Sequence, residues 1–202
     1  MSRLPSQPLF LTGTDTDVGK SVVAAWLMVK MAADYWKPIQ AGLQGETDSE
    51  AVRRLSGLPA SRFHPATFNL DAPLSPHESA RREGVEIRLE DFHLPLTPNP
   101  LIVEGAGGLL VPLNHQDYMV DLIQTLALPV VLVARSTLGT INHTLLSLAL
   151  LRERNIPLLG VILNGPPRPE NRQAIESYGK VEILAEIPTL PTLDSRSLSA
   201  IP

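Results

Sequence analysis

The sequence of 202 residues contains no cysteine. Disulfide bonds, a thiolate nucleophile and cysteine-bound zinc are therefore excluded. Aromatic residues make up only 4% of the chain, whereas apolar residues together make up 44%. A core must therefore be built mainly from aliphatic side chains, and this apolar fraction suffices for one folded domain over residues 1–202.

Long charged runs and long apolar runs are also missing. Basic residues form no run longer than a pair such as Arg81–Arg82, and the net charge is −4. Nucleic acid is therefore not expected as a partner, because phosphate contacts need clustered Lys and Arg. No apolar run approaches the ~20 residues that span a membrane, and residues 1–8 lack the apolar core of a signal peptide. We expect a cytoplasmic protein with no membrane partner.

Short apolar runs alternate with helical patterns along most of the chain. The predicted strands cover residues 9–11, 35–39, 101–103, 129–134, 158–163 and 181–184. The predicted helices cover residues 21–33, 48–55, 75–82, 117–126, 140–154 and 169–178. This alternation indicates an α/β fold of the P-loop NTPase type, with a mostly parallel sheet flanked by helices on both faces. Residues 191–202 are polar, and we expect them to be loosely held.

A glycine-containing segment joins the first predicted strand to the first predicted helix. Residues 13–21 read Gly-Thr-Asp-Thr-Asp-Val-Gly-Lys-Ser, which resembles a phosphate-binding loop. Backbone N–H groups at a helix N-terminus suit phosphate oxygens, Lys20 can reach the β- and γ-phosphates, and the Ser21 hydroxyl can ligate Mg²⁺. Thr14 takes the usual place of the first glycine of the loop. The alternative is an ordinary strand-to-helix turn that carries Gly-Lys-Ser by chance.

Polar side chains also follow other predicted strands, where ligands collect in open parallel sheets. Glu104, which begins Glu-Gly-Ala-Gly-Gly, is suited to hold Mg²⁺ beside a nucleotide; a solvated acid beside a flexible turn is the alternative. Lys37 ends the second strand, although by itself it could be a surface lysine. Asp48 follows in the next loop and could instead be a plain helix cap. Asn164 ends a later strand.

Several motifs occur in a fixed order along the chain, and together they resemble the dethiobiotin synthetase family. Besides the phosphate loop they are Lys-Pro-Ile-Gln-Ala-Gly at 37–42, Ser-Pro-His at 75–77, Val-Glu-Gly-Ala-Gly-Gly at 103–108, Leu-Gly-Thr-Ile-Asn-His at 138–143 and Glu-Ile-Pro at 186–188. The resemblance implies carboxylation of 7,8-diaminopelargonic acid with CO₂. ATP would then phosphorylate the resulting carbamate, and the second amine would close the ureido ring, releasing phosphate.

The resemblance also implies roles for individual residues. Lys20 and Lys37 would be catalytic, at the phosphate and at the carbamate respectively. The Mg²⁺ ligands would be Ser21, Asp48 and Glu104. ATP would contact Asp17, Val18, Gly19, Lys20, Ser21, Val22, Asp48, Glu104, Gly105, Ala106, Gly107, Asn164, Gly165, Pro188, Thr189 and Leu190. The diamine substrate would contact Thr16, Lys37, Ala41, Gly139, Thr140, Ile141 and Asn142. The family further implies a homodimer, in which residues 139–142 come from the partner subunit.

Three other functions fit parts of the sequence. A related ATP-dependent amide ligase would need an ammonia source, usually a glutaminase domain with a nucleophilic cysteine, which this chain lacks. A ParA-like ATPase switch would usually carry an extra lysine near Thr14 or Asp15, and none is present there. An inactive paralogue is disfavoured because Lys20, Lys37 and Glu104 are intact.

Overall fold

The computed structural model describes residues 7–201, and the expectations for residues 1–6 and for Pro202 lie outside the described residues. Seven strands form the main sheet in the order β4-β2-β6-β1-β7-β8-β9, and all its pairings are parallel. Their bounds are β1 Leu9–Gly13, β2 Asp34–Trp36, β4 Phe63–His64, β6 Leu101–Gly108, β7 Val130–Arg135, β8 Leu158–Asn164 and β9 Ile183–Ile187. The parallel α/β architecture predicted from the sequence is confirmed.

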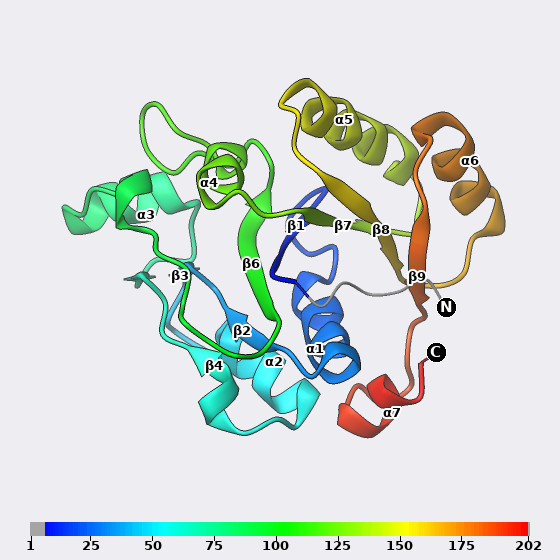
Figure 1. Ribbon diagram of the computed structural model, residues 1–202, viewed down its shortest axis with the longest axis horizontal. Coiled ribbons are helices and arrows are strands. Elements are labelled where there is room, and N and C mark those ends of the chain that lie inside the picture. The colour runs from blue at the N-terminus through cyan, green and yellow to red at the C-terminus, as the bar shows by residue number, and fades with distance from the viewer. Residues whose placement is uncertain (1–6, 202) are drawn as a thin grey trace.

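Helices cover both faces of this sheet (Figure 1). One face carries α1 (Lys20–Met31), α2 (Asp48–Ser56) and α7 (Ser195–Ser199), whose apolar residues share one core cluster. The other face carries α4 (Met119–Leu126), α5 (Thr140–Glu153) and α6 (Pro169–Gly179), and α3 (Pro76–Glu83) extends the same core beside the small sheet described below. Because both faces are covered, the central strands are continuous apolar runs.

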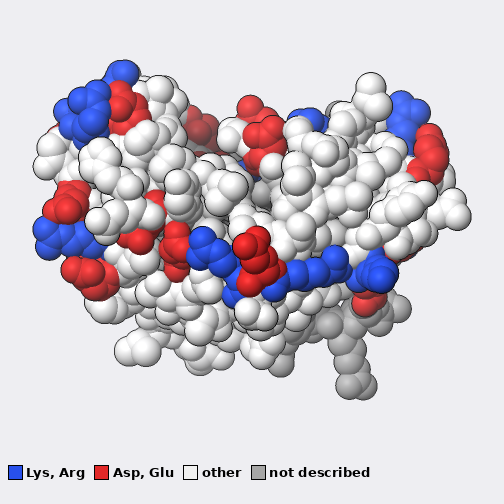
Figure 2. All heavy atoms as spheres, turned by 90° about the horizontal axis from the view of Figure 1, so that it is seen from above, with Lys and Arg blue, Asp and Glu red and all other residues white. Residues whose placement is uncertain are grey.

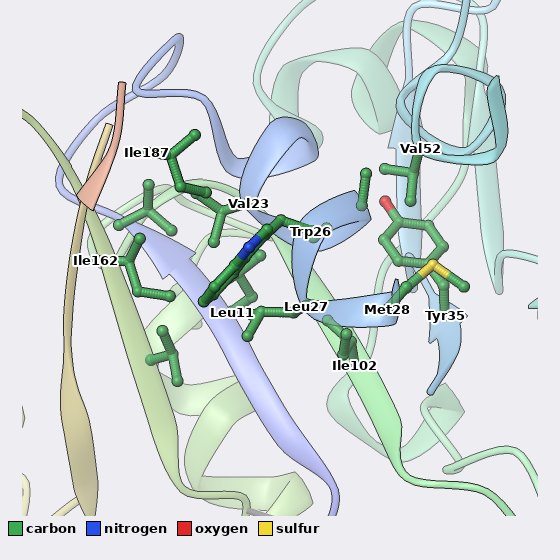
Figure 3. Close-up of a cluster of buried hydrophobic side chains, with 14 of the residues drawn as sticks. Leu11, Val23, Trp26, Leu27, Met28, Tyr35, Val52, Ile102, Ile162 and Ile187 are labelled. Atoms are coloured by element: carbon green, nitrogen blue, oxygen red, sulfur yellow. The ribbon is translucent and has the colours of Figure 1, made fainter. Parts of the chain in front are cut away.

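The core under α1 illustrates how alternating side chains serve both layers. Leu9 and Leu11 of β1 belong to the cluster under α1, whereas Phe10 between them belongs to the opposite cluster. Figure 3 shows Trp26 of α1 lying over Leu11, with Ile162 nearby on the same side of the sheet. This packing fixes α1 against the sheet and thereby fixes the loop that precedes it.

The structure corrects the expected strand at residues 35–39. β2 ends at Trp36, and β3 (Ile39–Ala41) pairs instead with β5 (Phe68–Leu70) in a separate two-stranded sheet. Pro38 stands at the break because it has no N–H for the sheet ladder. Its carbonyl accepts hydrogen bonds from the backbone of residues 67 and 68. The break leaves Lys37 between the two sheets.

The described part of the segment that was expected to be loose, residues 191–201, contains a short helix. Asp194 caps α7 by accepting a 2.8 Å hydrogen bond from the backbone of Ser197. Leu198 of α7 and Ile201 after it are buried in the cluster under α1. Most residues of this segment are polar, which was the reason to expect a loose tail. The two buried apolar side chains suffice to hold its single helical turn against the core.

Asp34 at the start of β2 ties together three segments far from the carboxyl ends of the strands. Its buried carboxylate contacts Arg62 (3.0 Å), His64 (3.1 Å), Thr97 (2.6 Å) and Asn99 (3.0 Å). Burial raises the pKa of Asp34, but the hydrogen bonds, led by Thr97 and Arg62, outweigh it and hold the pKa below its ordinary value. The ionised carboxylate is therefore the form that the fold stabilises.

We expect Asp34→Asn to lower the free energy of unfolding by about 2 kcal/mol at pH 7, because charge-assisted bonds to a buried group are lost. The pKa of Asp34 in the folded protein lies below its ordinary value of 3.8. The carboxylate therefore contributes its full stabilisation above the unfolded-state pKa, and this contribution is lost as the pH falls through the folded-state pKa. Urea unfolding of both proteins, from pH 7 down to about pH 3, checks this. A difference that does not shrink below pH 4 (roughly the unfolded-state pKa) would contradict it.

Candidate active site

The loop between β1 and α1 has the backbone geometry of a phosphate-binding loop. Asp17 and Gly19 both have positive φ angles, 56° and 90°. Such left-handed residues turn successive N–H groups toward one concave side, which binds anions. A Cβ on Gly19 would lie 2.1 Å from the Asn164 amide nitrogen, so a larger residue is excluded there. α1 begins at Lys20, and its N-terminus adds partial positive charge to the loop.

Lys20 folds back across this loop. Its ammonium donates a 3.1 Å hydrogen bond to the backbone carbonyl of Asp15, and the side chain is largely buried. Burial lowers the pKa of Lys20; the charge of Lys37 lowers it too, while the carboxylates of Glu104 and Asp48 raise it, and the net direction is downward. The ammonium group therefore lies within the concave side of the loop, next to the carbonyl of Asp15.

Oxygen atoms from three elements converge beside Lys20. The Ser21 hydroxyl of α1 donates to Asp48 Oδ1 of α2 at 2.8 Å, and it lies 3.3 Å from Glu104 Oε1 of β6. The helix-cap alternative for Asp48 is wrong, because Thr47 caps α2 and its hydroxyl accepts from the backbone N–H of Glu50. Asp48 is therefore available to the site.

Lys37 lies between the two carboxylates. Its Nζ is 2.9 Å from Asp48 Oδ2 and 3.2 Å from Glu104 Oε1, and the residue is only 3% exposed. Burial lowers the pKa of Lys37, but the charges of Glu104 and Asp48 outweigh it and raise the pKa above its ordinary value. Burial raises the pKa of Asp48, but the charge and hydrogen bond of Lys37 outweigh this effect and hold the pKa below its ordinary value. The surface-lysine and solvated-acid alternatives for Lys37 and Glu104 are wrong.

This donor set fits Mg²⁺ bound together with a nucleotide. Mg²⁺ prefers hard oxygen ligands, usually one or two carboxylates completed by phosphates and water. Asp48, Glu104 and the Ser21 hydroxyl offer such atoms at contact distance from one another. Among residues 7–201, no three His, Cys, Asp or Glu side chains form a metal-binding group. For an ion held by these three side chains, phosphate oxygens and water would complete the ligands.

A cavity of about 770 Å³ opens in front of these groups. Its walls include many predicted site residues, namely Thr16, Asp17, Gly19, Lys20, Ser21, Val22, Lys37, Ala41, Asp48, Ala106 and Gly107. Its other walls were not predicted as site residues, namely Ile39, Pro73, Leu74, Ser75, Pro76 and Val111. The Ser-Pro-His motif at 75–77 was the sequence signal that pointed to part of this wall.

Comparisons with known proteins agree with this geometry. A family model described as an AAA domain matches residues 7–197. An ATP-dependent dethiobiotin synthetase of Paramagnetospirillum magneticum is 55% identical over 194 residues, which are 96% of this chain and 94% of that protein. The chain belongs to the dethiobiotin synthetase family. A second member, from Brucella ovis, is 48% identical over 94% of this chain and 90% of its own length.

Another relative joins such a sequence to further residues. A biotin biosynthesis bifunctional protein of Bordetella avium is 51% identical over 94% of this chain, but the match covers only 41% of that protein.

Within residues 7–201 of the present chain, no helix is long and apolar enough to cross a membrane. On the face shown in Figure 2, basic and acidic side chains lie beside one another in several groups, and broad uncharged areas separate these groups.

Solved structures of lower identity show the same fold. A ParA family ATPase from Chlorobium tepidum is 15% identical, with a TM-score of 0.58 over 96% of this chain and 90% of that one. The septum site-determining protein MinD from Pyrococcus horikoshii, solved with Mg-ADP, is 16% identical, with a TM-score of 0.51 over 97% and 86%. The likeness to ParA thus extends to the fold alone, whereas the sequence places the chain among dethiobiotin synthetases.

The residues expected at the adenine base lie together beside the phosphate loop. Asn164 ends β8 and donates a 3.1 Å hydrogen bond to the carbonyl of Val18. Gly165 N donates to Ile187 O at 2.9 Å, which brings the start of the 188–190 segment next to β8. The Asn164 side chain lies against Gly19 of the loop, and neither Asn164, Gly165 nor residues 188–190 line the 770 Å³ cavity.

The segment expected at the substrate carboxylate begins α5. Gly139 has a φ of 90° and precedes the first residue of the helix, Thr140, which is buried. Arg135 connects this region to the phosphate loop, because its guanidinium lies 3.7 Å from Asp15 Oδ2 and 3.3 Å from His143 Nδ1. Residues 139–142 do not line the 770 Å³ cavity of the same chain.

Proposed function

We propose that this protein makes dethiobiotin from 7,8-diaminopelargonic acid, CO₂ and ATP, releasing ADP and phosphate. The observation that carries the proposal is the convergence of Lys37, Asp48, Glu104 and Ser21 at the mouth of a phosphate loop. Family membership supplies the substrates, and the cavity beside this cluster offers room for a small diamine next to a nucleotide.

The chemistry proceeds in three steps. One amine of the substrate attacks CO₂ and loses a proton, giving a carbamate. A carbamate oxygen then attacks the γ-phosphorus of ATP, and the bond to ADP breaks. The second amine attacks the carbon of this carbamic–phosphoric anhydride, the C–O bond to phosphate breaks, and the ureido ring closes. None of these steps needs a covalent bond to the protein, so catalysis depends on positioning and charge stabilisation.

The charged side chains suit these roles. Lys20, held over the loop by Asp15, would bind the β- and γ-phosphates, and Lys37 would contact the carbamate and the phosphoryl group that it receives. Ser21, Asp48 and Glu104 would hold Mg²⁺ together with the nucleotide phosphates, and the ion would neutralise charge on the transferring oxygens. Such fixed charges act strongly here because the site is partly buried.

Further contacts complete the proposal. Asn164, Gly165 and the 188–190 segment would receive the adenine base, and the loop residues 17–22 with Gly105, Ala106 and Gly107 would contact the phosphates. Thr16 and Ala41 would face the diamine. Ala41 lines the cavity with a methyl group, so it offers no hydroxyl hydrogen bond to the substrate.

One assay tests the activity. Purified protein receives the diamine, bicarbonate and Mg-ATP, and dethiobiotin and ADP are measured by mass spectrometry. Equal amounts of both products, formed only when the diamine is present, are expected. ATP hydrolysis that needs no diamine would contradict the proposal and favour a nucleotide switch.

A homodimer follows from the proposed carboxylate site at residues 139–142, and an apolar surface around α5 supports it. Leu110, Leu138 and Leu146 are all at least 60% exposed. Leu146 also lines a second cavity of about 510 Å³ together with Leu109, Leu150 and Thr14. Exposed leucines in contact with the rim of the phosphate loop suit a face that a second copy covers.

We expect sedimentation to give twice the 22.0 kDa mass of the chain and Leu146→Glu to give single chains at micromolar concentration. A buried glutamate without a partner would weaken the apolar interface. Leu96→Glu is the matched control, because Leu96 is fully exposed near the Asp34 end of the sheet. A Leu146→Glu protein that stays dimeric would exclude this face as the interface.

A further inference from the structure

Tyr35 brings a single polar atom into the core under α1 and α2. The residue is the middle one of β2 and is completely buried. Its ring centroid lies 5.7 Å from that of Phe63, and Figure 3 shows the phenol beside Val52 of α2 and Met28 of α1. The hydroxyl donates a 3.1 Å hydrogen bond to Glu104 Oε2. A phenylalanine would fill the same space, so packing alone does not require the hydroxyl.

The bond makes the two oxygens of Glu104 different. Oε1 faces the Ser21 hydroxyl at 3.3 Å and the Lys37 ammonium at 3.2 Å, whereas Oε2 faces Tyr35. A carboxylate is planar, so holding Oε2 also fixes the rotation that directs Oε1 toward Ser21. A buried carboxylate without this bond would be free to turn toward Lys37 with both oxygens.

Neighbouring strands place this pair of residues rigidly. β2 and β6 are paired with Tyr35 opposite Ile102 and Trp36 opposite Val103, so the long phenol reaches two residues along β6 to Glu104. A carboxylate oxygen only accepts hydrogen bonds, so the phenol hydroxyl is the donor of this pair. A donor fixed on one strand thus orients an acceptor fixed on the next.

We propose that Tyr35 is a positioning residue that turns Glu104 Oε1 toward the divalent cation of the bound Mg-nucleotide. The inference rests on the proposed function, because that function assigns Glu104 to the metal. Groups that orient metal ligands in this way typically change metal affinity 10- to 100-fold when they are removed. Tyr35 is thus a determinant of metal affinity, although it touches neither the metal nor the substrate.

Tyr35→Phe tests this assignment through metal binding. Mn²⁺ replaces Mg²⁺, and electron paramagnetic resonance measures free Mn²⁺ in the presence of the protein and ADP. We expect Mn²⁺ affinity to fall about 10-fold or more, while ADP affinity in the absence of metal changes less than about twofold, because the phosphate loop is untouched. Tyr178→Phe is the matched control, since Tyr178 of α6 is mostly exposed, and it should leave both affinities unchanged.

Two outcomes would overturn the assignment. A folded Tyr35→Phe protein that binds Mn²⁺ as tightly as the wild type would reduce the hydroxyl to a stability contact, whatever its melting temperature. If Tyr35→Phe alone does not fold, the double variant with Glu104→Gln decides. Restored folding would support the pairing, and continued failure would refute it. The Mn²⁺ assay measures no turnover, so the two proposals can fail separately. If the wild-type protein makes no dethiobiotin but Tyr35→Phe still lowers its Mn²⁺ affinity, the proposed reaction is refuted and this inference stands.

Discussion

Replacing Lys20 with glutamine should abolish measurable dethiobiotin formation while leaving the fold intact. The ammonium group is the positive charge that the phosphate loop supplies in addition to its backbone, and losing such a charge typically costs about 10²- to 10³-fold in rate. Among residues 7–201, the Lys20 ammonium donates one hydrogen bond, to the loop carbonyl of Asp15, so the variant loses little that holds the fold. The core under α1 does not depend on this bond.

The measurement for Lys20→Gln combines product formation with thermal unfolding. Lys30→Gln is the matched control, because Lys30 lies in the last turn of the same helix, where its ammonium donates to the carbonyl of Ser199. The control should retain activity within about twofold, as surface substitutions usually do. Normal activity in a folded Lys20→Gln protein would refute the assignment of the phosphate loop.

Residues that belong to a local sequence pattern could be assigned to the candidate site from the sequence alone. The loop at 13–21 and the acid of Glu104 follow apolar strands directly, so the strand order of an α/β fold brings them to one edge of the sheet. The role of Asp48 was ambiguous because an aspartate at that place could also be a helix cap. The bond from Glu50 N–H to Thr47 shows that Thr47 is the cap instead.

Other features depend on contacts between distant residues, which the sequence alone does not specify. The bond from Tyr35 to Glu104 joins positions 69 residues apart and depends on the register of β2 against β6. The docking of α7 depends on Leu198 meeting the cluster under α1, although its neighbours in sequence are polar. The sequence shows the proline after Lys37, but it does not show that β3 pairs with β5 in a separate sheet.

The two lysines of the site have different surroundings. Lys37 lies against the carboxylates of Asp48 and Glu104, whereas the hydrogen bond of the Lys20 ammonium goes to the carbonyl of Asp15. The carboxylates also raise the pKa of Lys37 and oppose the lowering of that of Lys20. A nucleotide that enters the cavity would therefore find the Lys20 ammonium without a carboxylate partner in hydrogen-bond contact, so a phosphate could pair with it. The Lys37 ammonium is already held by two carboxylates.

Replacing Lys37 with glutamine should reduce kcat by about 10²- to 10³-fold, the usual cost of losing a group that stabilises transition-state charge. The affinity for ATP should change much less, because Lys37 faces Asp48 and Glu104 rather than the phosphate loop. Removing one partner of a buried ion pair also destabilises the fold by about 3 kcal/mol, so unfolding must be measured alongside the rate. Lys37→Arg is the matched control for charge.

The split between rate and binding is what identifies the role of Lys37. Lys37→Arg keeps a cation between the carboxylates, although a planar guanidinium cannot reproduce the compact ammonium. It should therefore recover the stability lost in Lys37→Gln but only part of the rate. An unchanged kcat with weakened ATP binding in Lys37→Gln would instead assign Lys37 to the nucleotide. That result would separate the two lysines and contradict their joint action on one phosphoryl group.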